Sequence, residues 1–295
     1  MDRLNAMETF ANVVEAGSFS GAARRLNVGQ PAISKTVAQL EKRLGVRLLL
    51  RSTRGLAPTE AGQRFYERAR RAIDEADEAD RSARDAGAGL AGPLRICTAV
   101  TFARLRILPY LKPFLDAHPD LNIDVVLDDR HIDMLEEGID VALRMGTLSD
   151  SDMTARKIAQ SPRSVVGTPA YFAMAGVPAS PADLRRHAAV IHGPSGGHAW
   201  EFRRRGNRIS VAVSGRIKVN AAEGVRAAVL ADMGLAIVSE WMFEPELKSG
   251  ALKRVLTEWE LPPLDLWAVY PGGRMASAKA RAFIAYVEEL LSRPA

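Results

Sequence analysis

The sequence contains a single cysteine, Cys97, among its 295 residues. One thiol can form neither an internal disulfide nor a thiolate metal site, which fits a reducing compartment. The chain also lacks any run of about 18 apolar residues without charge, the length that a membrane-spanning helix needs. Residues 1–17 carry three acids and no apolar core of the kind that secretory signals have. We therefore expect a cytoplasmic protein with no membrane contact.

Motifs that would indicate catalysis or metal binding are absent or in the wrong context. No G-x-x-x-x-G-K-[ST] loop and no H-E-x-x-H helix occur. Residues 87–92 spell G-x-G-x-x-G, but a predicted helix precedes them and a predicted strand follows, the reverse of a dinucleotide site. Residues 193–197 spell G-x-S-x-G, yet no histidine follows His198 to complete a hydrolase triad. His192 and His198 alone are too few for a metal site. The sequence predicts no enzyme, no cofactor and no metal.

What is present is an ordinary globular composition, 47% hydrophobic and 25% charged, at a length suited to two domains. Charge is unevenly distributed. Residues 1–58 hold nine bases and four acids, a net charge of +5, whereas residues 59–90 carry −2 and the remaining 205 residues +2. A basic segment on a nearly neutral body indicates a polyanion-binding module, although basic segments also occur as plain solvated surface.

The basic segment is predicted to form three short helices. Leu4, Met7, Ala11 and Val14 recur at helical spacing up to Gly17, and Ser18 can cap a second helix. A third helix is predicted over residues 30–44, with Pro31 in the first turn, where its missing N–H costs nothing. Its buried stripe is Ile33, Val37, Leu40 and Leu44, which leaves the following residues free to face outward: Gln30, Ser34, Lys35, Gln39 and Lys42.

Two helices joined by a tight turn, the second with a polar and basic outer face, have the organisation of a helix-turn-helix. Residues 46–50 are β-prone, and a turn through Ser52, Thr53, Arg54 and Gly55 follows, so a basic wing can lie beside the third helix. Periodicity alone is equally compatible with a three-helix core that has ordinary polar residues on its surface.

A long helix is predicted over residues 59–86. Its least polar positions recur with a period of 3.5 residues, as in a coiled-coil seam: Phe65, Ala69, Ala72, Ala76, Ala79, Ala83 and Ala86. We interpret this seam as a dimerisation surface. The alternative is a solvated helix, because alanine favours helix without any partner.

Residues 87–93 contain three glycines and a proline and form the predicted linker. Beyond it, predicted strands alternate with helices, which favours an α/β domain with a mainly parallel sheet, large enough for two lobes. The predicted strands are residues 94–100, 122–128, 139–145, 164–168, 188–192, 208–220, 234–239 and 264–270.

Several segments of the chain are similar to LysR-type transcriptional regulators. The dense part of the resemblance comprises Phe10 to Ser20, Ala22 to Leu26, Gln30 to Ser34, Leu40 to Gly45, Leu49, Arg51 and Thr59 to Gly62. Less specific matches follow at Phe114-Leu115, His118-Pro119, Asp140 to Gly146 and Gly234 to Ile237. One departure is Gly29, where the family often has serine.

The resemblance implies a winged helix-turn-helix at 1–58, a dimerising linker helix at 59–88 and an effector-binding domain at 89–295. That domain would resemble periplasmic binding proteins, with one α/β lobe at about 93–163 plus 268–295 and the other at about 164–267. The implied partners are double-stranded promoter DNA, a small-molecule effector and further copies of the chain in a dimer or tetramer, with RNA polymerase as a further candidate. A solute-binding protein with a structural head is the alternative, against which the lack of a signal peptide argues.

The resemblance also implies site residues. Gln30, Pro31 and Ser34 would lie at the major groove, with Lys35 and Gln39 nearby, and a glutamine suits adenine. Arg51, Thr53 and Arg54 would contact phosphates or the minor groove from the wing. The effector would lie between the lobes, where Val100, Thr101 and Phe102 are expected at a helix N-terminus that favours an anion. The other expected effector contacts are Arg144, Gly146, His192, Asn220 and Ser239.

Overall fold

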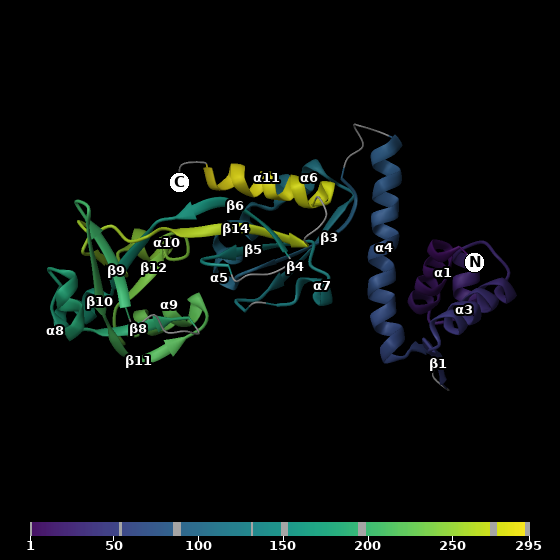
Figure 1. The fold of residues 1–295 in the computed structure, drawn as a ribbon, viewed down its shortest axis with the longest axis horizontal. Helices are drawn as coiled ribbons and strands as arrows, with labels where there is room; N and C mark the ends of the chain where they lie inside the picture. The colour runs from purple at the N-terminus through teal and green to yellow at the C-terminus, as the bar shows by residue number, and fades with distance from the viewer. Residues whose placement is uncertain are drawn as a thin grey trace. The chain divides into compact units, whose positions relative to one another are not determined.

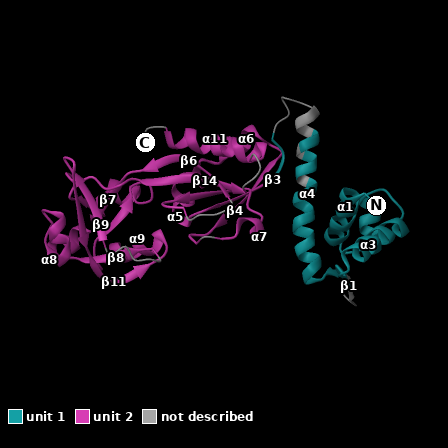
Figure 2. Cartoon of the chain, viewed as in Figure 1, with its two compact units in different colours: residues 1–93 teal, residues 94–295 magenta. Residues whose placement is uncertain are grey.

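The computed structural model describes residues 2–52, 55–84, 90–130, 132–148, 153–193, 199–271 and 276–292. The side chains of residues 51, 52, 55, 74, 78 and 81–84 lie outside this description. The chain divides into two compact units, Met1–Pro93 and Leu94–Ala295 (Figure 2). Within the described ranges, no helix combines the length and apolar character needed to cross a membrane.

The first unit contains three short helices, a two-stranded wing and a long helix (Figure 1). Its elements are α1 (Arg3–Ala16), α2 (Phe19–Arg25), α3 (Gln30–Leu44), β1 (Leu49–Ser52), β2 (Gly55–Pro58) and α4 (Glu60–Arg84). Side chains begin two of the helices as expected, because Asp2 accepts a hydrogen bond from Leu4 N–H (3.0 Å) and Ser18 accepts one from Gly21 N–H (3.0 Å).

The core of this unit joins α1, α2, α3 and the start of the wing. Phe10, Val13, Ile33, Val37 and Leu40 are all buried within it. The predicted stripe of α3 is therefore confirmed at three of its four positions. Leu44 is the exception, being 39% exposed, because α3 ends there and Gly45 turns the chain away at φ 70°.

The junction between the wing and α4 depends on a close backbone approach. Thr59 Oγ1 donates to the carbonyl of Arg47 (2.9 Å) and accepts from Gly62 N–H (2.8 Å), so Thr59 caps α4 and ties it to the segment before β1. A Cβ atom at Gly62 would lie 1.9 Å from the carbonyl oxygen of Leu48. Only glycine fits at this position.

The second unit begins with a five-stranded sheet in the order β4-β3-β5-β14-β6. Its strands are β3 (Gly92–Thr98), β4 (Leu121–Leu127), β5 (Val141–Met145), β6 (Met153–Ser161) and β14 (Leu264–Pro271). Its helical segments are α5 (Val100–Phe102), η1 (Ala103–Ile107), η2 (Leu108–Tyr110), α6 (Lys112–Ala117), α7 (Met134–Glu137) and α11 (Ala278–Ser292). We call this sheet with its helices the first lobe.

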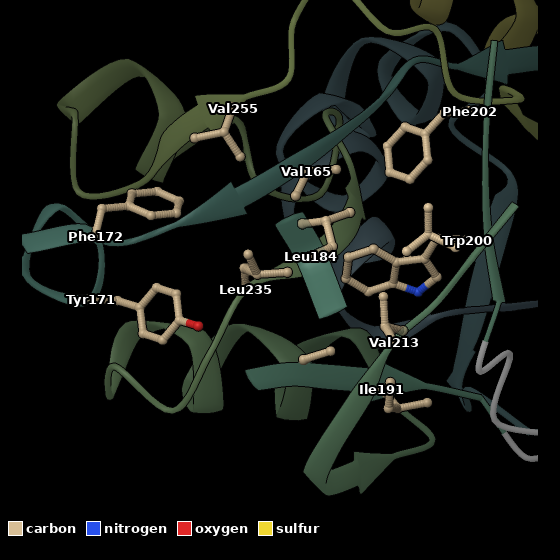
Figure 3. Packing of buried hydrophobic residues seen from close by; sticks show 12 residues of the cluster. Val165, Tyr171, Phe172, Leu184, Ile191, Trp200, Phe202, Val213, Leu235 and Val255 are labelled. Carbon is tan, nitrogen blue, oxygen red and sulfur yellow. The ribbon is translucent and has the colours of Figure 1, made fainter. Parts of the chain in front are cut away.

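The second lobe comprises residues 163–261 as far as they are described. Its strands are β7 (Arg163–Gly167), β8 (Ala188–His192), β9 (Ala199–Arg204), β10 (Asn207–Ala212), β11 (Ser214–Val219), β12 (Ala236–Ser239) and β13 (Lys253–Val255). Its helical segments are α8 (Pro169–Ala175), η3 (Pro181–Arg186), α9 (Ala222–Leu230) and α10 (Glu244–Ser249). Phe202, Trp200 and Leu235 are among the residues that fill its core (Figure 3).

The predicted parallel sheet is only partly correct. β3 and β5 pair in parallel, as do β8 and β11, but β14 runs antiparallel to β5 and β6, and β7 runs antiparallel to β12 and β13. β6 leads directly into β7 and β13 is followed by β14, so the strands by which the chain enters and leaves the second lobe run antiparallel. The predicted strand 208–220 is two strands, interrupted at Val213, while β6, β9 and β13 were missed.

Candidate functional site

The exposed face of α3 is the candidate nucleic-acid interface. Gln30, Pro31, Lys35 and Gln39 are exposed, whereas the apolar stripe of the same helix faces the core. The turn before α3 is held by backbone bonds such as Val28 N–H to Ala23 O (3.0 Å). α2 and α3 therefore form a helix-turn-helix with a polar second helix.

Ser34 differs from these four residues because it is only half exposed. It borders a hollow between α3 and the wing that Phe19 and Leu56 also line. Of the predicted wing contacts, the Arg51 side chain, Thr53 and Arg54 lie outside the described residues. The backbone of Arg51 is in β1, opposite Leu56 in β2.

Glu41 positions the wing, a role that sequence reasoning missed. Its Oε1 atom accepts hydrogen bonds from the N–H groups of Leu48 (2.7 Å) and Leu49 (3.1 Å). The carboxylate thereby joins α3 to the beginning of β1. No periodicity signal marks such a residue, because the bonds connect a polar helix position to the backbone several residues further on.

The predicted seam of α4 is divided between two environments. Phe65 packs edge-to-face on Phe10 at 5.4 Å between ring centroids, and Ala69 is 1% exposed, so both contribute to the core of their own unit. Ala72 and Ala79 are exposed and Ala76 is half-buried. The side chain of Ala83 is outside the described residues. The exposed alanines are the part of the seam that α1 does not cover.

A cavity of about 320 Å³ lies between the two lobes of the second unit. This volume is in the range of small-ligand sites. Arg144, His192, Asn220 and Ser239, the residues that the family resemblance placed at such a cleft, are among those that line it. Its lining also includes Asp129, Arg163 and Trp200, which sequence reasoning missed. Asp129 could have been found, since it directly follows a predicted strand.

Four other predicted contacts are not among the residues that line the cavity. The Thr101 hydroxyl is buried and donates to Glu223 Oε2 (3.0 Å), and the Phe102 ring lies 6.2 Å from that of Trp241. The backbone N–H of Val100 donates a hydrogen bond to the Asp129 carboxylate. Gly146 lies in a neighbouring hollow, where its carbonyl accepts a bond from Trp267 Nε1 (2.9 Å). Thr101 and Phe102 are thus buried against the second lobe, while Val100 and Gly146 take part through their backbone groups.

Two arginines, Arg144 and Arg163, line the cavity together with two carboxylates, Asp128 and Asp129. Arg144 donates to the carbonyl of Arg130 (2.7 Å), and Arg163 donates to that of Pro262 (3.4 Å). Among the described residues, neither forms an ion pair with a carboxylate. Burial lowers the pKa of the Arg163 guanidinium, which shows that its charge is poorly solvated. Both groups suit an anion placed between the lobes.

Asp129 supplies a negative charge at the same cavity. Burial raises the pKa of its carboxyl, and hydrogen bonds from the N–H groups of Val100 and Ala222 oppose that shift. Burial lowers the pKa of the facing His192 imidazole, while the Asp129 charge opposes the change. The chain's own carboxylate thus occupies the position at Val100 where sequence reasoning placed an anionic effector.

Ser239 has a structural partner as well as a place in the cavity wall. Its hydroxyl lies 2.6 Å from that of Ser161, and both residues are buried. Ser161 ends β6, just before the chain enters the second lobe. The pair therefore fixes the wall of the cavity at the point where the lobes are joined.

Comparison with known proteins follows the same division of the chain. Residues 4–63 match the family described as the bacterial regulatory helix-turn-helix protein, lysR family, and residues 87–292 match the LysR substrate binding domain. An uncharacterized HTH-type transcriptional regulator of Haemophilus influenzae is 34% identical over 93% of this chain and 96% of its own. The HTH-type transcriptional regulator PgrR of Escherichia coli is 34% identical over 93% of each chain.

Solved structures agree with these matches. CrgA, a LysR-type transcriptional regulator from Neisseria meningitidis, is 28% identical with a TM-score of 0.61 and covers 99% of this chain and 100% of its own. The Vibrio cholerae virulence activator AphB is 26% identical with a TM-score of 0.57, over 97% of this chain and 98% of its own. The chain belongs to the LysR family of transcriptional regulators, DNA-binding proteins that carry an effector-binding domain.

Proposed function

We propose that this regulator reads promoter DNA with the exposed face of α3 and responds to a small anionic effector bound between the lobes. The effector part rests on one observation: Arg144 and Arg163 line the cavity and form no ion pair with a described carboxylate. Burying a guanidinium without a carboxylate in direct contact is costly, and a bound carboxylate or phosphate would supply the ion pair that Arg144 and Arg163 lack among the described residues.

Base reading is assigned to α3. Gln30 can bond bidentately to adenine, Pro31 offers only an apolar contact, and Lys35 and Gln39 extend the same exposed face. Ser34, which is half exposed, is assigned a DNA contact at the edge of α3. Arg51, Thr53 and Arg54 are proposed as phosphate or minor-groove contacts of the wing, which add affinity and salt dependence more than sequence choice.

Members of the family oligomerise, and we propose α4 as the pairing element of a dimer, or of a tetramer built from two dimers. The surface is the row of Ala72, Ala76, Ala79 and Ala83, since α1 already covers Phe65 and Ala69. Alanines allow two helices to approach closely. RNA polymerase remains a candidate partner of the assembled regulator, and cytoplasm its proposed location.

The effector proposal is tested by a thermal-shift measurement with paired probes. Sulfate, phosphate and a set of small carboxylates are compared with the matching neutral amides, on the full chain and on Arg163→Met and Arg144→Met. At least one anion should raise the melting temperature of the unmodified chain, while its amide does not. Both variants should lose the effect. An amide that binds as well as its acid, or variants that keep the full shift, would exclude the anionic site.

A further inference from the structure

The second unit has little net charge, but its basic and acidic residues are unevenly distributed along the sequence. Residues 181–220 hold eight bases and two acids, a net charge of +6, whereas the other 165 residues beyond residue 90 carry −4. Half of these bases lie in the hairpin formed by β9 and β10, at Arg203, Arg204, Arg205 and Arg208. η3, which ends with Arg185 and Arg186, packs against β10.

The hairpin has one apolar and one cationic face. Trp200 and Phe202 of β9 point into the core of the second lobe (Figure 3). Arg203 follows Phe202 and so lies on the opposite face of the strand, where it is exposed and directly opposite exposed Arg208 in β10. Like charges placed opposite each other destabilise an antiparallel pair. Neither arginine forms an ion pair with a carboxylate that the structure describes.

The turn of the hairpin carries a third exposed arginine, Arg205, in an unfavourable backbone conformation. Arg205 and Gly206 connect the strands with φ values of 48° and 83°. A two-residue turn with two positive φ values favours glycine, asparagine or aspartate at its first position. An arginine in the left-handed region is strained, because its Cβ atom comes too close to the following carbonyl oxygen. Stability of the fold therefore does not account for an arginine at this turn.

Contacts with residues 258–260 fix the position of the hairpin. The side chains of Arg203, Arg205 and Arg208 are exposed. Arg204 lies 5.4 Å from the ring centroid of Trp259 and forms an ion pair with Glu258. The backbones of Arg203 and Glu260 exchange two hydrogen bonds of 2.8 Å. Two more acids are close in the fold, Glu201 on the outer face and Glu260 beside Arg203, but neither forms an ion pair with Arg203 or Arg208 among the described residues.

We propose that Arg203, Arg205 and Arg208 bind DNA phosphates, as a second DNA contact that is separate from α3. A rigid hairpin loses little entropy when it binds, and the planar guanidinium forms two parallel hydrogen bonds with a phosphate. DNA is the polyanion to which regulators of this family bind. The contact reads no bases, so it adds affinity on any sequence. The alternative ligand, an acidic protein surface, is separated from DNA by the test.

The test uses the full chain and the triple variant Arg203→Thr, Arg205→Gly, Arg208→Thr. Threonine suits a strand and glycine suits the positive φ, so the variant should fold at least as well as the parent. Binding to a random-sequence duplex is measured from about 50 to about 200 mM salt. The slope of log K against log salt is negative, and it should become less steep by about 0.9 for each phosphate that the variant no longer neutralises, counted over every subunit that contacts the DNA.

A charge-matched control carries Lys112→Gln, Lys248→Gln and Lys253→Gln, three exposed residues of the second unit outside the hairpin. Its slope should equal that of the parent. An unchanged slope in the hairpin variant, or equal decreases in the two variants, would overturn the proposal. It would also be overturned if the hairpin variant kept its DNA affinity and lost binding only to polyglutamate, which would assign the surface to an acidic protein.

Discussion

The hydroxyl of Thr101 in α5 donates a hydrogen bond to Glu223 in α9, with 3.0 Å between the two oxygens. The bond joins the first lobe to the second beside the cavity, and Thr101 is fully buried. Glu223 also faces Arg104 and Arg226, each at 3.6 Å. Polar contacts of this kind can be exchanged when the lobes move, so a ligand that contacts both lobes can shift their arrangement.

The substitution Thr101→Val removes this hydroxyl with little change in shape. We expect it to lower the free energy of unfolding by about 1 to 3 kcal/mol, because the bond is to a charged group. Urea unfolding measures the loss. A matched control is Thr154→Val, at a half-buried position of β6. Equal small effects of both substitutions would show that the Thr101 bond contributes nothing specific.

Replacing Gly62 with alanine should destabilise the first unit. A Cβ atom there would meet the carbonyl oxygen of Leu48 at 1.9 Å, and that oxygen also accepts a bond from Thr59 N–H (2.8 Å). Relief of the clash requires a backbone shift, which typically costs about 1 to 3 kcal/mol. Thermal unfolding of the full chain, followed by helix content, measures this. An unchanged transition would mean that the wing is not packed on α4 as described.

The proposed pairing surface of α4 is tested by Ala76→Glu. A carboxylate buried between two helices is costly, so the variant should shift the sedimentation equilibrium towards smaller assemblies. Gln63→Glu is the control, since it introduces the same charge at an exposed position on the other side of α4. If Ala76→Glu assembles like the parent, α4 pairs through another face or not at all.

Sequence periodicity predicted the first unit nearly to the residue because its signals are local. α3 spans Gln30–Leu44 as expected, and Gly17 and Gly45 end their helices with positive φ. α4 was predicted correctly as a helix, but its seam was read as a single surface. Ile73 is 5% exposed, and a heptad count through the alanines does not reveal that this position is buried.

The second unit was predicted less well because its pairing is long-range. β14 completes a sheet whose other strands lie more than a hundred residues earlier, and no local pattern reports its antiparallel direction. The residues that line the cavity were likewise predicted only in part. His192 and Asn220 end predicted strands and were named through the family resemblance, whereas Arg163 begins a strand and was missed. Thr101 was placed in the cavity because its bond to Glu223, 122 residues away, leaves no trace in the sequence.

The charge distribution shows a further limit of counting by segment. A net charge of +2 over the last 205 residues suggested a nearly neutral body, but residues 181–220 alone carry +6. Strand register then places Arg203 opposite Arg208. The turn at Arg205 depends on its φ value, which composition does not report.

Base reading by α3 is the central claim, and Gln30→Ala tests it most directly. Footprinting on the DNA upstream of the protein's own gene would define the site, and equilibrium binding would then be measured on that site and on a random duplex. Gln30 is exposed, so its loss should leave folding unchanged. We expect a loss of about 1 to 3 kcal/mol on the specific site and far less on the random duplex. An equal loss on both would contradict the reading of bases by this helix.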